Sequence, residues 1–594
     1  MTENNQELTE VTASESEAVN KTAVKEVKHS GLSVILNKFF HHIDRGSTLK
    51  GEIMSGLTVF FLSICVIFMN VQLIASTLGV NVAVETAPEG PINIANATSI
   101  ASIYIASVLV AFIGSLVIGL IARLPFVQVS MMGLGSSMLS FIGAGAGLTY
   151  YNLLFVSFIS AIIYAVLVSV PVVRKFVFEA LPAPVRKALP AALGLILAFI
   201  AIQLSGVVSV AYNQVGGSAM ALPVLNTGSI MSGASSVTVI AFVACMIAMA
   251  IYFALRALKL KHPVFWAFVG GTLTFVLVMI IANGMETSNG DSFLNFGRLW
   301  VMISSQASEV TPFGDSYFSY MGEGFVSVFT NFGKVFSEGT QFAEGVNAGS
   351  FVISGVLCYL FLGMYDMQAV LTATEDNLNA SADEFNKVDF GKEKDSRIAL
   401  MCNAGMNVVA PMFGVGGVSS SLSVSATRDN GKSGLTAVVA SLGFLVAIFV
   451  WAFPFLFATK TYVVDSMNAF NYNAYGNGGF IYCFNGLSFG IANAVIFLMG
   501  VTMLKSLSSV NFKEVSESAP AIVTVVASLV LTNLAYGVAF GVIVYCLTKL
   551  LSFRKNENEG WLASLKNNFL TGVKEISIPT AVLCVLMIVM LVTA

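Results

Sequence analysis

Two short stretches of the chain combine glycines and serine hydroxyls inside otherwise apolar sequence. Residues 133–140 read GLGSSMLS and residues 416–423 read GGVSSSLS, so the two agree at five of eight positions. Glycine-interrupted polar segments at corresponding places in two halves of a membrane protein are typical of the solute site of an inverted-repeat transporter. Close helix packing through small residues is the alternative for either stretch alone. Their pairing favours a solute site.

The chemistry of this site depends on how the two stretches meet. If they are half-helices that meet head-on, their amide groups and positive dipole ends converge on one point. Neither stretch contains Lys or Arg, so the point accepts carbonyl-rich heterocycles and small anions alike. The predicted substrate contacts are Gly133, Gly135, Ser136, Ser137, Val418, Ser419, Ser420 and Ser421.

Asp366 is the clearest charged residue inside an apolar segment, and such residues are functional candidates. A buried carboxylate must be paired, protonated or in contact with a polar cavity, and the last two states suit a group that couples transport to protons or sodium. The alternative is an aspartate near the cytoplasmic end that caps a helix or reaches the surface. Gln368 is predicted either to bind substrate or to face a neighbouring helix. Asn70, Asn403 and Asn407 either line the cavity or form interhelical hydrogen bonds.

These residues are positioned by an unusually apolar chain. Of 594 residues, 56% are hydrophobic and 11% charged, and the mean hydropathy is +0.81. Runs long enough to cross a core of roughly 30 Å recur throughout, which predicts an all-α polytopic membrane protein. We expect fourteen transmembrane segments in two sets of seven, the third and tenth being short, discontinuous and meeting at the midplane. Because seven is odd, the second repeat runs inverted relative to the first.

The predicted organisation has five parts. Residues 1–47 form a cytoplasmic polar tail with an amphipathic stretch, 48–284 the first repeat, 285–346 a long extracytoplasmic loop, 347–551 the second repeat, and 552–594 a C-terminal amphipathic or hydrophobic segment. Within these parts, continuous spans are expected at about 52–78, 99–121, 150–172, 187–210, 234–256, 263–284, 349–373, 396–412, 433–457, 486–505, 519–532 and 535–551. The apolar stretch 576–594 is either an interfacial helix or a fifteenth span. Lys and Arg gather in alternate loops, which predicts a cytoplasmic N-terminus in the cytoplasmic (inner) membrane.

Several classes are disfavoured by what the sequence contains. The net charge is −3 and no basic domain is evident, so nucleic acid is not an expected partner. The seven cysteines are scattered without a CxxC, and no nucleotide-binding or hydrolase motif is present. We therefore expect no metal and no cofactor other than a proton or sodium ion, and an enzyme is the least favoured class.

The chain resembles the xanthine/uracil permease group of nucleobase:cation symporters, and within it the adenine/guanine/hypoxanthine permease branch. The motifs that carry the resemblance are GLTVF at 56–60, FMN at 68–70, LPF at 124–126, MGL at 132–134, VRKALP at 185–190, Tyr365 with Asp366, and NGKSGLTA at 430–437. The resemblance implies fourteen segments in two inverted sevens, a substrate between the third and tenth, and a homodimer.

Two positions depart from the pattern of that family. The place of its tenth-segment glutamate is taken by Leu422, and the place of its third-segment asparagine by Gly135. The run SSLSVS at 420–425 also looks like the tenth segment of sulfate-permease relatives, which bind anions on the same fold.

The resulting hypothesis is a secondary active transporter that carries a small polar, nucleobase-like solute across the lipid bilayer by alternating access, with Asp366 as the ion-coupling group. One alternative keeps the fold and makes the solute a small inorganic or organic anion. The other is a membrane scaffold that transports nothing.

Overall fold

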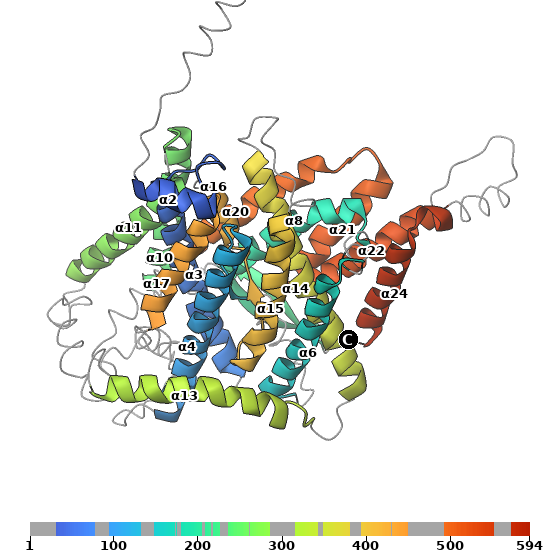
Figure 1. The fold of residues 1–594 in the computed structure, drawn as a ribbon, viewed down its shortest axis with the longest axis horizontal. Helices are drawn as coiled ribbons and strands as arrows, with labels where there is room; N and C mark the ends of the chain where they lie inside the picture. The colour runs from blue at the N-terminus through green and yellow to red at the C-terminus, as the bar shows by residue number, and fades with distance from the viewer. Residues whose placement is uncertain are drawn as a thin grey trace, which may run out of the picture.

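The computed structural model describes residues 31–77, 94–131, 148–172, 174, 180–204, 208–215, 218–225, 236–260, 262–285, 315–342, 348–379, 394–428, 431–448, 492–551 and 572–593. They form a bundle of long apolar helices (Figure 1). In the first half the elements are α2 (Gly31–Phe40), α3 (Leu49–Thr77), α4 (Ile94–Val117), the π-helical turn η1 (Ile118–Ala122), β1 (Val129–Ser130), α6 (Tyr150–Ser169), α8 (Ala183–Leu204), β2 (Val208–Val215), β3 (Ser218–Leu225), α10 (Ser236–Ala257) and α11 (Pro263–Met285).

The second half continues the bundle. Its elements are α13 (Asp315–Ser337), α14 (Ala348–Asn379), α15 (Lys394–Met412), β4 (Val418–Ser419), α16 (Ser423–Arg428), α17 (Gly434–Ile448), α20 (Ala492–Met503), the 3-10 turn η5 (Leu504–Ser509), α21 (Val515–Val530), α22 (Leu534–Leu550) and α24 (Ile578–Thr593). Each predicted continuous span overlaps one of these helices.

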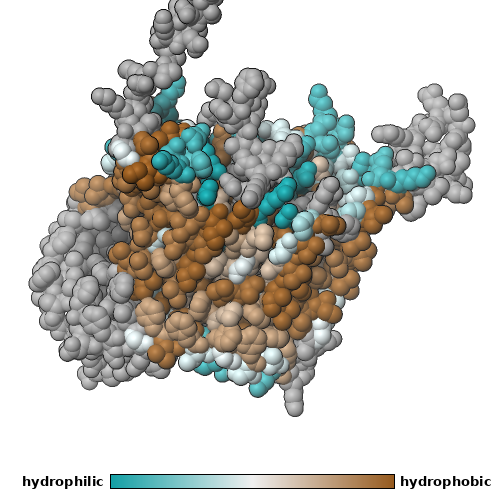
Figure 2. Space-filling view, in the orientation of Figure 1, coloured by the Kyte–Doolittle hydropathy of each residue, from teal (hydrophilic) through white to brown (hydrophobic). Residues whose placement is uncertain are grey.

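The described part of the chain has the character of a membrane protein. Four of its helical stretches are long and apolar enough to cross a bilayer, namely Ser102–Ala122, Tyr150–Ser169, Ala183–Ile202 and Gly349–Asn379. Figure 2 shows apolar residues across the middle of the visible face and hydrophilic residues gathered at the end where α2 lies. An apolar belt of this kind is expected where side chains contact lipid instead of water.

Two segments differ from the prediction, and a third had been left open. The span expected at 187–210 ends as a helix at Leu204, and the antiparallel hairpin β2–β3 follows it in a region predicted as the end of a span and a loop. The long loop 285–346 contains the helix α13, which crosses one end of the bundle nearly perpendicular to its long helices (Figure 1). The stretch 576–594, left open above, forms α24, which packs against α14 and α22.

The helices pack into two bodies. The first contains α3, α4, α6, α13, α14, α15, α16 and α17, and the second contains α8, α10, α11, α20, α21 and α22. Helix α14 also contacts α8 and α22 of the second body, so it lies along the seam between the two. The hydrophobic core includes residues from both sides of this seam.

Candidate solute site

The two polar stretches predicted from the sequence approach each other through short extended segments. Strands β1 and β4 pair antiparallel, with Val129 opposite Ser419 and Ser130 opposite Val418. The backbone N–H of Met131 donates to the carbonyl of Gly417 at 2.9 Å and extends the contact. Extended backbone inside an apolar bundle needs a partner for each polar group, and here the strand contact supplies part of these partners and side chains supply others.

This geometry corrects the expectation of a half-helix that begins at residue 416. In the second stretch the backbone is extended at 418–419, turns, and becomes helical only at Ser423, where α16 begins. The backbone N–H groups near Val418 therefore donate to side-chain oxygens, as Val418 does to Asn407 and Ser421 to Ser419. They do not point along a helix axis toward a shared ligand. Gly133, Gly135, Ser136 and Ser137 of the first stretch lie outside the described residues.

Side chains from neighbouring helices hold the paired strands. The Asn70 amide on α3 donates to the carbonyl and hydroxyl of Ser130 at 3.0 and 2.7 Å. The Asn407 amide oxygen on α15 accepts from the N–H of Val418 at 3.0 Å. The Ser157 hydroxyl on α6 donates to the carbonyl of Gly416. Of the two readings given for Asn70 and Asn407, the structure therefore favours hydrogen bonding between segments.

Asp366 lies in the interior of α14 and is 3% exposed, a position that excludes a role in capping or in reaching the surface. Its carboxylate accepts hydrogen bonds from the Ser419 hydroxyl and from the backbone N–H of Ser420. Its Oδ2 has no hydrogen-bond partner among the described residues. A buried carboxylate oxygen without a donor costs free energy, so it is available to a solute or a proton.

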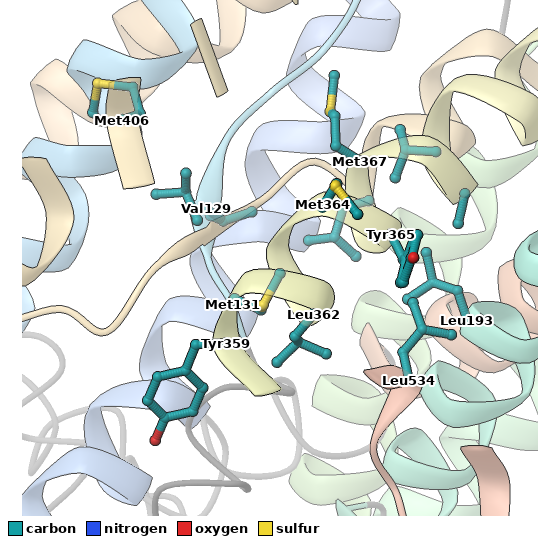
Figure 3. Packing of buried hydrophobic residues seen from close by; sticks show 14 of the residues in the cluster. Val129, Met131, Leu193, Tyr359, Leu362, Met364, Tyr365, Met367, Met406 and Leu534 are labelled. Atoms are coloured by element: carbon teal, nitrogen blue, oxygen red, sulfur yellow. The ribbon is translucent and has the colours of Figure 1, made fainter. Parts of the chain in front are cut away.

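That carboxylate faces a cavity of about 40 Å³ at the seam between the two bodies. The polar residues of its lining are Ser130, Asp366, Ser419, Ser421 and Thr532. Its apolar residues are Val66, Val129, Met131, Leu193, Ile196, Leu197, Ile200, Leu362, Leu422 and Leu534. Figure 3 shows Leu193 and Leu534 approaching from one side and Met131 and Leu362 from the other.

The remaining predicted residues lie around this cavity in different ways. Val418 is fully buried in β4, and the Ser420 hydroxyl is buried without a partner among the described residues; neither lines the cavity. Gln368 is 8% exposed and its Oε1 also has no described partner, but it does not line the cavity. Two residues along a helix turn a side chain to a different face, which separates Gln368 from Asp366.

Sequence reasoning missed the apolar wall from α8. The wall is one face of α8, formed by Leu193, Ile196, Leu197 and Ile200. Their helical spacing was the feature of the sequence that could have identified this face. It did not single out these residues because the other faces of α8 are also apolar. Thr532, at the turn between α21 and α22, has φ 47° and joins the same lining.

Among the described residues that line the cavity, none carries a positive charge, and Asp366 is the one ionisable side chain. The site can therefore accept hydrogen bonds from N–H or O–H groups at the carboxylate and exchange hydrogen bonds at its hydroxyls, while its walls contact apolar or aromatic surface. No cluster of His, Cys, Asp and Glu in the described part of the chain has the arrangement of a metal site.

Comparison with known proteins extends the resemblance given by the motifs. The chain is 20% identical over 514 residues to the guanine/hypoxanthine permease PbuO of Bacillus subtilis, covering 86% of this chain and 94% of that protein. It is 23% identical over 518 residues to the adenine permease AdeP of Escherichia coli, covering 87% and 91%. The predicted resemblance to nucleobase permeases is thereby confirmed over most of the chain. No family model matches the chain.

Among solved structures, the transmembrane domain of a cyanobacterium bicarbonate transporter, BicA, is similar with a TM-score of 0.31 and 14% identity, covering 78% of this chain and 97% of that domain. The relatives named above are permeases, so the similarity favours a membrane transporter over an enzyme.

Proposed function

We propose that this protein is a secondary active transporter of a neutral, nucleobase-like solute. The observation that carries the proposal is the unpartnered Oδ2 of Asp366, which lies in a cavity whose described lining contains no cation. A purine or pyrimidine presents N–H donors that suit a carboxylate acceptor and flat apolar faces that suit Leu and Ile walls. The adenine and guanine/hypoxanthine permeases to which the chain is similar support the same solute class.

Alternating access is supported by the position of the cavity. One wall consists of α14 of the first body together with β1 and β4, which contact α4 and α15 of that body. The opposite wall consists of α8 and the beginning of α22 in the second. A displacement of one body against the other would widen the cavity toward either side of the membrane. Such rocking of one bundle against another around a fixed site is a general mechanism of secondary transporters.

The small size of the cavity also supports a mechanism in which the solute site closes when no solute is bound. A volume of about 40 Å³ has room for roughly three water molecules, given that one needs about 10–15 Å³. A purine has about ten heavy atoms and requires a wider space. The Leu and Ile side chains of α8 must therefore withdraw when the solute binds and return when the site closes.

The anion alternative is less well supported. An anion in this cavity would approach the Asp366 carboxylate with no described Lys or Arg in the lining to offset the repulsion. Protonation of Asp366 would remove that repulsion and supply one O–H donor, but no positive charge. Sulfate, bicarbonate and small carboxylates are therefore included in the test as competing ligands.

The proposal includes further features that come from the sequence. We retain fourteen segments in two inverted repeats within 48–284 and 347–551, a cytoplasmic N-terminus in the inner membrane, and a homodimer. Coupling through Asp366 uses a proton or a sodium ion. Asp366, Ser419 and Ser421, which line the cavity, are the proposed substrate contacts, and residues 133–137 are retained from the sequence. Val418, Ser420 and Gln368 do not line the cavity, so a substrate contact by them requires the site to open.

The test is a ligand panel on purified protein, read as the rise in melting temperature that any native-state ligand produces. It sets adenine, guanine, hypoxanthine, xanthine and uracil beside sulfate, bicarbonate and small carboxylates. We expect a nucleobase to stabilise the wild type and Glu52→Gln, which removes a buried carboxylate far from the cavity, but not Asp366→Asn. Uptake into proteoliposomes should follow the same pattern. If only anions stabilise the protein, the solute is an anion and the proposed nucleobase-like solute is wrong. If Asp366→Asn takes up nucleobase as fast as the wild type, the proposed role of the carboxylate is wrong.

A further inference from the structure

Helix α2 carries an apolar face that no other described segment covers. Leu32, Ile35 and Phe39 are 61%, 66% and 42% exposed, and their spacing of three and four residues places them on one side of the helix. Ser33 is buried on a second side, which faces the bundle, and Lys38 is exposed on a third. A helix with one apolar and one basic side in addition to its protein contact is suited to lie in a membrane interface.

The position of α2 in the molecule agrees with such a role. It lies at the end of the bundle where the apolar belt gives way to hydrophilic residues (Figure 1, Figure 2). At this level an apolar side chain contacts lipid chains while a lysine reaches the headgroups. This is also the end that we propose to be cytoplasmic, and the cytoplasmic leaflet carries anionic lipids.

Two cationic side chains from distant parts of the sequence lie against α2 and the turn that follows it. The Arg123 guanidinium lies 4.8 Å from the centre of the Phe39 ring. The Lys432 ammonium lies beside Gly46, at which an added Cβ would be 3.6 Å from the Lys432 Nζ. Both side chains are partly buried, and neither forms a salt bridge among the described residues. Their positive charge is therefore available to an anion that approaches α2.

The backbone of these two residues belongs to a junction between three segments. The carbonyl of Arg123 accepts hydrogen bonds from the N–H of Gly434 at 2.9 Å and from the Arg45 guanidinium at 2.7 Å. Arg45 also donates to the carbonyl of Lys432 at 3.3 Å. The turn after α2, the end of η1 and the start of α17 thus meet at one point, and Arg45 brings a third positive charge to it.

Positive charge exceeds negative charge on and around α2. The cationic residues are Lys38, Arg45, Arg123 and Lys432, and the carboxylates are Asp44 and Glu52. Glu52 is buried, and its oxygens accept hydrogen bonds from N–H and hydroxyl groups of residues 432–436. The surface beside the apolar face therefore attracts anions, and a phosphate group suits its arginine and lysine side chains.

We infer that α2 and the cations beside it form a binding site for an anionic phospholipid. The headgroup phosphate contacts Arg123 and Lys432, and the acyl chains pack on Leu32, Ile35 and Phe39. Basic groups next to membrane helices bind anionic headgroups in this way. A lipid bound here stabilises the first body, because the junction joins η1 to the start of α17. The inference goes beyond the transport function and does not depend on the solute.

The experiment measures the melting temperature of the full chain in detergent during titration with lipid. Dioleoylphosphatidylglycerol is compared with dioleoylphosphatidylcholine, which has the same chains and no net charge, and with glycerol 3-phosphate, which has the phosphate and no chains. Arg123→Gln with Lys432→Gln removes the two cations and keeps the backbone junction, and Ile35→Asn alters the apolar face at an exposed position. Lys513→Gln is the control, because Lys513 is an exposed lysine outside α2 and its contacts.

We expect phosphatidylglycerol to stabilise the wild type and Lys513→Gln saturably and more strongly than the other two ligands. The double variant should bind phosphatidylglycerol about tenfold or more weakly and phosphatidylcholine as before, whereas Ile35→Asn should weaken both.

Four results would overturn the inference. Equal stabilisation by the two lipids would remove the anionic headgroup, and equal stabilisation by glycerol 3-phosphate would make the ligand a free phosphate ester. Unchanged lipid affinity in the double variant or in Ile35→Asn would place the lipid elsewhere. If no lipid stabilises the protein, the apolar face of α2 is covered by residues 1–30 or by a second copy of the chain. The nucleobase panel can fail without affecting any of these results.

Discussion

The amide oxygen of Asn407 on α15 accepts a 3.0 Å hydrogen bond from the backbone N–H of Val418, the first residue of β4. Val418 lies opposite Ser130 of β1, and the next residue, Ser419, donates its hydroxyl hydrogen to Asp366. A single side chain from a neighbouring helix thus positions the strand that presents a hydroxyl to the buried carboxylate.

Asn407→Ala should therefore weaken both the fold and solute binding. It leaves the N–H of Val418 unpaired in the core, which costs about 1–3 kcal/mol of the free energy of unfolding. We expect a lower melting temperature and a weaker nucleobase affinity. Asn511→Ala is the control, because Asn511 accepts a backbone hydrogen bond at an exposed loop, where substitutions usually change stability by no more than about 0.5 kcal/mol. Full nucleobase affinity in Asn407→Ala would contradict the positioning role.

Leu197→Phe should obstruct transport by filling the cavity from α8. Phenylalanine is larger than leucine and would occupy space that the solute needs, so uptake should fall by about tenfold, which corresponds to about 1.4 kcal/mol. Leu195→Phe makes the same change on the same helix at a half-buried position that does not line the cavity, and its uptake should stay close to wild type. Initial rates in proteoliposomes measure both. Equal losses in the two variants would indicate general damage to α8.

Glu52→Ala should lower stability while leaving solute affinity intact. Glu52 is fully buried and accepts hydrogen bonds from the N–H groups of Lys432 and Ser433 at 2.9 and 3.3 Å and from the hydroxyl of Thr436 at 2.6 Å. These groups precede and begin α17, where a negative charge is also favoured by the helix dipole.

Removing the carboxylate leaves buried donors unpaired, so the expected loss is about 1–3 kcal/mol in the free energy of unfolding. Thermal melting with and without nucleobase separates stability from binding. A larger effect on nucleobase affinity than on melting temperature would show that this contact takes part in the transport site.

Cys546 of α22 and Cys584 of α24 should form a disulfide under mild oxidation. Their thiol groups lie within hydrogen-bonding reach of each other, and both are reduced in the structure. Added iodine takes two electrons and is reduced to iodide, the two thiols release two protons, and a sulfur–sulfur bond forms between the helices. Mass spectrometry of non-reduced digests should detect the linked peptides. Cys546→Ser should abolish them, and their absence in the wild type would contradict the packing of α24 against α22.

Much of the architecture is already determined by local composition. Apolar runs of sufficient length form helices because a backbone away from water must bond within its own segment, and each expected continuous span overlaps a described helix on that account. A carboxylate inside such a run, Asp366, had to be buried within protein rather than exposed to lipid. The repeated Gly and Ser of 133–140 and 416–423 indicated two irregular segments, and β4 lies in the second of them.

Tertiary structure decided which groups meet. A membrane helix is apolar on its lipid-facing and protein-facing sides alike, so its sequence does not show that Leu197 of α8 faces Asp366 rather than lipid. The backbone bonding that makes residues 418–419 a strand depends on a partner almost 290 residues earlier, at 129–130, and on Asn407 from a third segment. Hydrogen-bond partners this distant are specified by packing geometry, and no local pattern in the sequence contains them.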